Sequence, residues 1–246
     1  MPYGIPAISP RPETSRSNRF LAALPPDDYA RLTPHLRPLT LERGTVLHDS
    51  GDQIEQVYFP HTGMVSLVAI MRTGASIETM TVGNGGVVGH SVALGGRHAV
   101  GRAIVQLPGS ASRIAAARLH AAAQESKAIH ELALQYNDLL LAQVQQSVGC
   151  NALHGLEARL CRWLLQAHDC VGGSEVPLTQ EFLGQMLGAR RTSVTISARL
   201  LQSAGMISYR RGHIHILDRC ALEDAACECY ATIRQQTDKA FAYAAR

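Results

Sequence analysis

VPLTQEFLGQMLGARRTSVTISARLLQSAGMISYRRGHIHIL, residues 176–217, contains signals for two short helices followed by a hairpin. Thr179 is a good N-cap because its hydroxyl can accept a hydrogen bond from a backbone N–H in the first helical turn. The helix after it ends at Gly188, and Ala189-Arg190-Arg191 leads into a second helix. The first helix carries apolar residues on one face: Phe182, Leu183, Met186 and Leu187. Two short helices that meet across a tight glycine-containing turn form a helix-turn-helix.

The second helix and the residues behind it complete this unit. Apolar positions alternate in the helix with Thr192, Ser193, Thr195 and Arg199; they are Val194, Ile196, Ala198, Leu200 and Leu201. Met206–Tyr209 and His213–Leu217 are short β-prone runs on either side of Arg210-Arg211-Gly212. This pattern predicts a β-hairpin with a basic tip, the wing of a winged helix.

Positive charge is concentrated in this unit. Residues 176–217 hold five arginines and one acidic residue, Glu181, whereas the whole chain has a net charge of only +3. A local basic patch of this kind suits the neutralisation of DNA phosphates. The alternative is a small solvated helical hairpin whose arginines serve solubility, but the turn, the helical period and the charge placement agree independently on DNA binding.

Length and composition indicate one large or two ordinary globular domains. The chain has 246 residues, of which 46% are hydrophobic and 17% charged. No run approaches the length of a membrane span, and we expect no membrane partner. The N-terminal residues 1–19, MPYGIPAISPRPETSRSNR, predict a disordered tail rather than a signal peptide or an anchor.

The six cysteines do not predict a secreted disulfide scaffold, because none precedes Cys150. We therefore expect a cytoplasmic protein. Cys227 and Cys229 form a Cys-x-Cys pair without partners at ligand spacing, and His213 and His215 share one strand face without further ligands. The sequence thus predicts free thiols, no metal site and no cofactor.

Residues 20–116 predict a sensor domain built as an antiparallel β-roll. A short, proline-interrupted helical segment covers residues 20–37, and short β-prone runs between turn residues follow it. Many short strands at close spacing indicate a roll or barrel. The predicted strands are Thr45–His48, Val57–Phe59, Met64–Ile70, Ser76–Val82, Val87–Val88, Ala103–Leu107 and Ala111–Ile114.

Residues 117–155 predict one long helix and a hinge, with Gly149 and Gly155 on either side of the hinge. A helix that is apolar on two faces needs two partners, here the β-roll and the same helix of a second subunit. One stripe contains Leu134, Leu141, Val144 and Val148. We assign the dimer interface to the other stripe, which contains Ile129, Leu132, Tyr136, Leu139 and Gln143.

Residues 156–246 predict the winged helix-turn-helix domain. A helix over Leu156–His168 is expected to pack under the DNA-binding unit, and one further helix is expected over Ala221–Ala244. The fold class is therefore α+β, with a cyclic-nucleotide-binding-like β-roll, a long dimerisation helix and a C-terminal winged helix-turn-helix.

This order resembles the cyclic-AMP receptor protein and fumarate–nitrate-reduction regulator (Crp/Fnr) family of bacterial transcription factors. The most similar segments are GDQIEQVYF from Gly51, TGMV from Thr62, and TQEFLGQMLG from Thr179 followed by Arg191. The resemblance implies that Arg191 reads guanine and that Thr179 contacts phosphate, with a DNA operator, a second copy and RNA polymerase as partners. The predicted DNA-binding residues are Thr179, Gln180, Arg190, Arg191, Thr192, Ser193, Thr195, Arg199, Arg210 and Arg211.

Two departures from the family concern its effector. Cyclic-AMP-binding members have a Gly-Glu pair for the ribose and an arginine for the phosphate, whereas this chain has Gly89-His90-Ser91. Arg102 falls one position past the expected arginine. A shift of one residue along a strand turns the side chain to the opposite face, unless a change in loop length restores the register. We predict an effector pocket at Gly89, His90, Ser91, Arg102 and Ala103 that does not respond to cyclic AMP.

Other functions find less support in the residues. The absence of cysteine before Cys150 excludes the N-terminal iron–sulfur ligands of the oxygen-sensing branch. Haem would need an axial ligand such as His61, His90 or His98. No Gly-x-Ser-x-Gly, His-Glu-x-x-His or Walker loop occurs, so we expect no enzyme. The alternative to a regulator is a ligand-binding or scaffold protein whose winged helix contacts other proteins.

Overall fold

The computed structural model describes residues 17–171 and 175–244. Its N-terminal half is a β-roll of two antiparallel sheets, one in the order β1-β7-β3 and the other in the order β2-β6-β4-β5. This confirms the predicted roll. The strands are β1 (Arg37–Leu41), β2 (Val46–His48), β3 (Gln56–Pro60), β4 (Met64–Ile70), β5 (Ser76–Val82), β6 (Arg102–Leu107) and β7 (Gly109–Ala115). Strand β1 was missed in the sequence, where its proline masked the β pattern.

Short helices close the roll: α1 (Arg19–Ala23), α2 (Pro26–Leu32), η2 (Thr33–His35) and η3 (His90–Leu94). Residues 1–16 of the predicted tail lie outside the described residues. Asn18 belongs to the folded part, because its buried amide donates to the carbonyls of Pro60 and Gly86, both at 2.8 Å.

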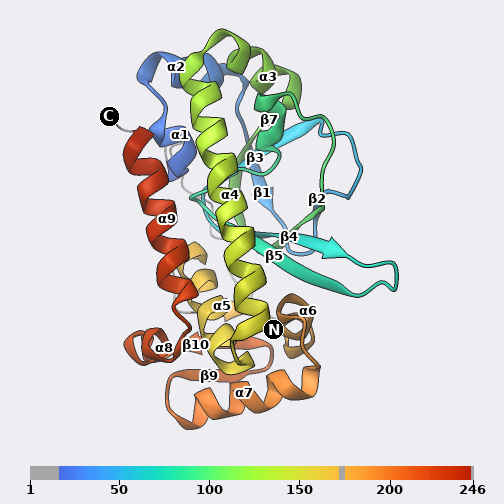
Figure 1. The fold of residues 1–246 in the computed structure, drawn as a ribbon, viewed down its shortest axis with the longest axis vertical. Helices are drawn as coiled ribbons and strands as arrows, with labels where there is room; N and C mark the ends of the chain where they lie inside the picture. The colour runs from blue at the N-terminus through green and yellow to red at the C-terminus, as the bar shows by residue number, and fades with distance from the viewer. Residues whose placement is uncertain (1–16, 172–174, 245–246) are drawn as a thin grey trace, which may run out of the picture.

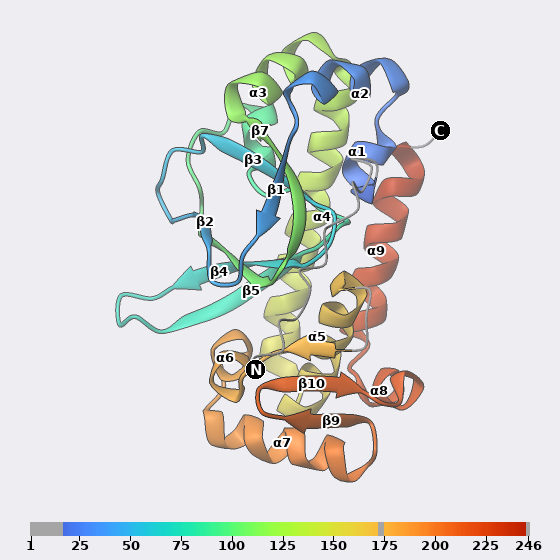
Figure 2. The ribbon, with the colours of Figure 1, turned by 180° about the vertical axis from the view of Figure 1, so that it is seen from behind.

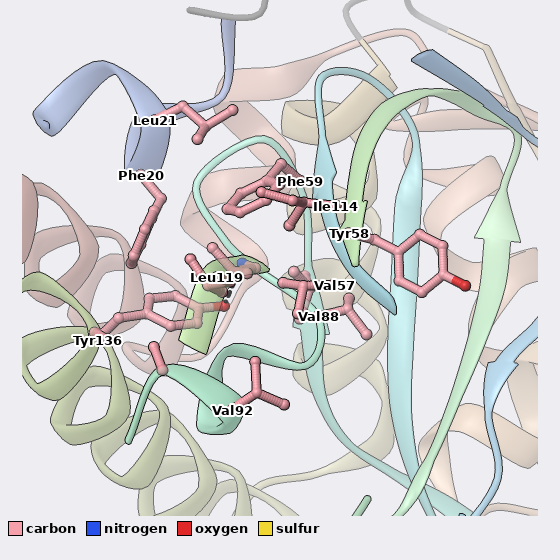
Figure 3. Close-up of a cluster of buried hydrophobic side chains, with 14 of the residues drawn as sticks. Phe20, Leu21, Val57, Tyr58, Phe59, Val88, Val92, Ile114, Leu119 and Tyr136 are labelled. Atoms are coloured by element: carbon pink, nitrogen blue, oxygen red, sulfur yellow. Dashed lines mark hydrogen bonds between the residues drawn. The ribbon is translucent and has the colours of Figure 1, made fainter. Parts of the chain in front are cut away.

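The core of the roll extends onto the long helix α4 (Lys127–Leu153), as Figure 3 shows. Phe20 packs against Phe59 and Tyr136, with ring centroids 6.0 and 5.9 Å apart. The Tyr136 hydroxyl accepts from the backbone N–H of Val87 at 2.9 Å, and burial raises the pKa of this phenol. Helix α4 is therefore part of the core of the roll and not only a connector.

The predicted single helix over residues 117–155 is two helices, α3 (Ala116–Glu125) and α4. Ser126 breaks the run because its backbone is extended, and its hydroxyl caps α4 by accepting from the N–H of Ile129 at 3.2 Å. Gly149 lies inside α4, so the helix breaks only at His154-Gly155. Helix α4 then runs the length of the molecule, from the roll to the C-terminal half (Figure 1).

The C-terminal half contains a three-stranded sheet in the order β8-β10-β9 and helices around it (Figure 2). Trp163 of this half is fully buried. The elements are α5 (Leu156–Val171), β8 (Glu175–Pro177), α6 (Gln180–Leu187), α7 (Arg191–Ser203), β9 (Ile207–Arg210), β10 (His213–Ile216), α8 (Arg219–Ala225) and α9 (Cys229–Ala244).

The predicted single helix over Ala221–Ala244 is also wrong. The chain becomes extended at Ala226, so α8 and α9 are separate helices. Helix α9 then returns beside α4 as far as α1, and Arg19 forms an ion pair with Asp238 at 2.9 Å (Figure 1). The last helix therefore joins the two halves of the molecule. None of the helices in the described ranges is long and apolar enough to cross a bilayer.

Candidate nucleic-acid interface and effector cavity

The turn between α6 and α7 has the predicted geometry. The Thr179 hydroxyl accepts from the N–H of Phe182 at 3.3 Å, which confirms the N-cap, and Gly188 ends the helix in the left-handed region with φ 59°. Gly184 brings the two helices together, because a Cβ there would lie 2.9 Å from the carbonyl oxygen of Ala189. Only glycine fits this close approach without a shift of the backbone.

Helix α7 buries one side against α5 and leaves the other exposed. Val194, Ala198 and Leu201 are buried, and no acidic residue occurs between Arg191 and Ser203. Arg190, Arg191, Thr192 and Arg199 are exposed, while Ser193, Thr195 and Gln180 are partly covered. The Thr195 hydroxyl donates to Gln180 Oε1 at 2.7 Å, so these two side chains, both predicted to contact DNA, are bonded to each other.

Ile196 and Leu200 belong to this exposed face, although both are apolar. Their exposures are 61% and 51%. Ile196 lies one helical turn after Thr192, and that spacing is the signal that could have placed it on the polar face. Apolar side chains on a recognition helix can contact the methyl group of thymine.

The wing confirms the predicted hairpin within one residue at each end. Arg211 and Gly212 form its two-residue turn, with φ of 51° and 81°, and Arg210 pairs with His213 across it. Two consecutive positive φ values are typical of a type I′ hairpin turn. Arg210 and Arg211 are exposed, and a Cβ at Gly212 would lie 3.8 Å from the Thr179 side chain. The basic tip therefore lies beside the start of α6.

A cavity of about 460 Å³ lies between the roll and α4. Most of its lining is apolar, including Leu67, Met80, Val88, Ala103, Leu140 and Val144. Four of its polar side chains are His48, His90, Ser91 and Asn137. His90 Nε2 lies 3.3 Å from Asn137 Oδ1, and burial lowers the pKa of both histidines. The lining of this cavity suits a largely apolar ligand with a few polar groups.

Four of the five predicted effector residues line this cavity: Gly89, His90, Ser91 and Ala103. Arg102 does not, because it lies on the other face of β6 with Ile104 and Gln106. Its guanidinium binds Asp49 through Nε at 3.1 Å and Nη2 at 2.6 Å, and this hydrogen bonding lowers the pKa of Asp49. The offset of one residue thus reverses the face, and the prediction of Arg102 as a pocket residue is wrong.

The three candidate haem ligands do not come together. His90 lines the cavity, His98 is exposed, and His61 lies at the end of β3, with Nε2 2.8 Å from Ser112 Oγ. His48 also lines the cavity and was not among the predicted residues; its buried Nε2 has no hydrogen-bond partner among residues 17–171 and 175–244. Its place follows from a three-residue strand, which gives a weak signal in the sequence.

The burial of the two apolar stripes of α4 is the reverse of the predicted one. The stripe predicted for the dimer interface is buried inside the subunit, with exposures between 0% for Ile129 and 9% for Gln143. The other stripe is exposed at Leu134, Leu141 and Val148, to 48%, 56% and 65%. The predicted interface residues are therefore wrong, because the roll core and α9 already cover them.

The hairpin of β4 and β5 joins the cavity to the helix-turn-helix. Leu67 and Met80 line the cavity, whereas Ser76 Oγ accepts from Gln185 Nε2 of α6 at 2.6 Å. Between these positions lies Glu78, which is buried. Its carboxyl accepts from Trp163 Nε1 of α5 at 2.8 Å and from the Ser66 hydroxyl, and burial raises its pKa.

Two family models match this chain, one for each half. A Crp-like helix-turn-helix domain matches residues 158–225, and a cyclic nucleotide-binding domain matches residues 38–126. Comparison with curated proteins gives no match.

Solved structures share this fold over about three quarters of the chain. FixK2 from Bradyrhizobium japonicum is 16% identical, with a TM-score of 0.66 over 78% of this chain and 98% of that chain. A CRP-family transcriptional regulator from Thermus thermophilus is 19% identical, with a TM-score of 0.63 over 76% and 96%. The c-di-GMP responsive global regulator CLP from Xanthomonas campestris is 16% identical, with a TM-score of 0.60 over 77% and 98%. At these identities the likeness concerns the fold.

The two matched domains lie in the order that the structure shows, with α4 between the roll and the winged helix. The Thermus thermophilus protein is described as a transcriptional regulator and the Xanthomonas campestris protein as a global regulator. This chain, with its β-roll, its long helix and its winged helix-turn-helix, belongs to the Crp/Fnr family of transcriptional regulators.

Proposed function

We propose that this protein is a homodimeric, sequence-specific DNA-binding regulator whose roll responds to a ligand other than cyclic AMP. The observation that carries DNA binding is the exposed face of α7, where Arg190, Arg191 and Arg199 stand without an acidic neighbour on the helix. The wing arginines extend this basic surface beside the N-cap of α6. RNA polymerase remains a predicted partner.

The two groups of arginines have different expected roles. Arg191 is the first residue of α7, where side chains of a recognition helix reach base edges. A bidentate contact from it to guanine is worth about 1–3 kcal/mol of discrimination. Arg211, at the tip of a two-residue turn, is placed to contact phosphates, which gives affinity without sequence preference.

The test selects binding sites from a randomised duplex library and then measures affinity for the selected site and its single-base variants. Arg191→Ala should reduce the spread among the variants, whereas Arg211→Ala should weaken all sequences alike and lower the salt slope by about one. Equal loss of specificity in both variants would refute the two roles. A wild-type protein that enriches no sequence and shows no salt dependence would favour the scaffold alternative.

The dimer is proposed to form through the exposed stripe of α4. Leu134, Leu141 and Val148 recur every seventh residue, the repeat of a coiled-coil interface. Leu141 also lines the cavity, so a second α4 would cover one side of it. Two recognition helices on one face of DNA then require half-sites about one helical turn apart.

Leu141→Glu should shift the protein from dimer to monomer in sedimentation, because it places a charge in the interface of both subunits. Met71→Glu is the matched control, since Met71 is 51% exposed but lies in the β4–β5 hairpin. A dimer that survives Leu141→Glu and Val148→Glu together would refute this interface.

The proposed lack of a cyclic-AMP response rests on the cavity lining. A buried cyclic phosphate needs a charge-assisted partner, and the nearby arginine is turned away and bound to Asp49. The ribose hydroxyl would meet His90, which burial disfavours as a cation and Asn137 already engages. Each unsatisfied polar group would cost about 1–3 kcal/mol.

Calorimetric titration of the dimer with cyclic AMP should show no binding tighter than about millimolar, the affinity that corresponds to about −4 kcal/mol. Native mass spectrometry of protein purified from its own host should show whether a mainly apolar molecule is retained. Micromolar binding of cyclic AMP that also raises operator affinity would refute the proposal.

A further inference from the structure

Four side chains meet where α4, α5 and α9 converge. Cys150 and His154 are one turn apart at the end of α4, whereas Cys227 lies just before α9 and Cys229 at its start. Their Sγ and imidazole nitrogen atoms all lie within 4.8 Å of one another. The sequence showed a Cys-x-Cys pair without partners at ligand spacing; the structure supplies two partners from more than seventy residues away.

The spacing of these atoms suits one tetrahedral ion. Cys150 Sγ lies 3.6 Å from Cys227 Sγ, and Cys229 Sγ lies 3.5 Å from His154 Nδ1. Tetrahedral zinc with bonds of about 2.3 Å to sulfur and about 2.0 Å to nitrogen separates two thiolates by roughly 3.8 Å, and a thiolate and an imidazole by roughly 3.5 Å. An iron–sulfur cluster, which places several irons and sulfides between its ligands, needs a wider arrangement.

The surroundings also differ from those of ordinary buried cysteines. A free buried thiol normally packs among aliphatic side chains. Here the three cysteines form a small cluster of their own, in which Ala158 is the one further apolar contact among the described residues. Cys150 and Cys229 are fully buried and Cys227 is 7% exposed, so the sulfur atoms face one another rather than the main cores.

Two side chains next to the cluster, Glu228 and Gln146, are positioned like the outer partners of metal ligands. Glu228 Oε1 lies 3.1 Å from His154 Nε2, which directs the other ring nitrogen, Nδ1, at the cluster. A carboxylate behind a histidine is the usual outer partner of a zinc-bound imidazole. Gln146 Nε2 donates to Cys229 Sγ at 3.0 Å, a contact that favours a thiolate over a thiol.

We propose that Cys150, His154, Cys227 and Cys229 bind one zinc ion in a closed, four-coordinate structural site. Three thiolates and an imidazole are a ligand set that prefers zinc among the common divalent metals. The ion would tie the end of α4 to the turn between α8 and α9. Since α8 and α9 both pack on α5, it would hold the DNA-binding half at a defined angle to the long helix. The site does not depend on the proposed effector or on DNA binding.

The first experiment measures metal in the full-length protein, purified under reducing conditions without chelator. Elemental analysis by inductively coupled plasma mass spectrometry should find one zinc ion per subunit. Replacement by Co²⁺ should give the visible absorption and thiolate charge-transfer bands of a tetrahedral sulfur-rich site. Wild-type protein that binds no more zinc after reconstitution than the Cys227→Ser variant would refute the proposal. So would a Cys150–Cys227 disulfide in freshly reduced protein, or an iron–sulfur spectrum.

The variants separate ligation from folding. Cys227→Ser and His154→Ala should each lose most of the zinc, whereas Cys220→Ser, an exposed cysteine in the neighbouring helix α8, should keep it. Glu228→Gln leaves all four ligands in place, so it should keep the ion but weaken its affinity about tenfold to 100-fold in competition with a chelator. Loss of zinc in Cys220→Ser, or unchanged affinity in Glu228→Gln, would contradict the assignment.

Discussion

Trp163→Phe tests the buried contact that joins the roll to the DNA-binding half. The indole N–H of Trp163 in α5 donates to the Glu78 carboxyl of β5 at 2.8 Å, and both side chains are buried. Phenylalanine keeps an aromatic ring there but has no donor. An unsatisfied buried acceptor costs about 1–3 kcal/mol. The loss of roughly 40 Å³ of ring volume adds about 1 kcal/mol at ~24 cal/mol per Å³.

The expected loss in the free energy of unfolding is therefore about 2–4 kcal/mol. Urea unfolding followed by circular dichroism measures it without relying on the fluorescence of the replaced tryptophan. The same substitution in a Glu78→Met background should cost only about 1 kcal/mol, because the acceptor is gone and only the volume term remains. Equal costs in the two backgrounds would refute the assignment of the effect to this hydrogen bond.

Three further predictions concern single positions. Glu78→Gln should become more stable relative to wild type as pH rises. Burial raises the pKa of Glu78 in the folded state, so the stabilisation by this carboxyl is present below its unfolded pKa and is lost as pH rises through its folded pKa. An identical pH profile of unfolding would contradict this. Gly184→Ala should lower the melting temperature, because the new Cβ would lie 2.9 Å from the Ala189 carbonyl oxygen. This clash should outweigh the ~1 kcal/mol by which alanine is favoured over glycine in a helix. A raised melting temperature would show that the turn relaxes. Arg102→Ala should leave the melting temperature nearly unchanged, because its ion pair with Asp49 is exposed to solvent. It should also leave ligand uptake by the cavity unchanged, and a loss of ligand would show that Arg102 belongs to the pocket after all.

Local signals were enough to predict the helix-turn-helix and the wing. The Thr179 cap, the Gly188 stop and the Arg211-Gly212 turn each act within a few residues, so the sequence determined them. The same holds for β4 and β5, whose bounds match the prediction. Helix breaks at Ser126 and Ala226 were missed because neither residue is a strong breaker by itself.

The tertiary structure decided which face each side chain presents. Both stripes of α4 are apolar, and only the packing of the roll and α9 determines that Leu141 remains exposed while Leu132 is buried. The pairing of β6 turned Arg102 out of the cavity. The Cys–His cluster depends on contacts between residues 77 and 75 positions apart in the chain. Such contacts leave no periodic trace in the sequence, because the two segments are brought together by the folding of everything between them.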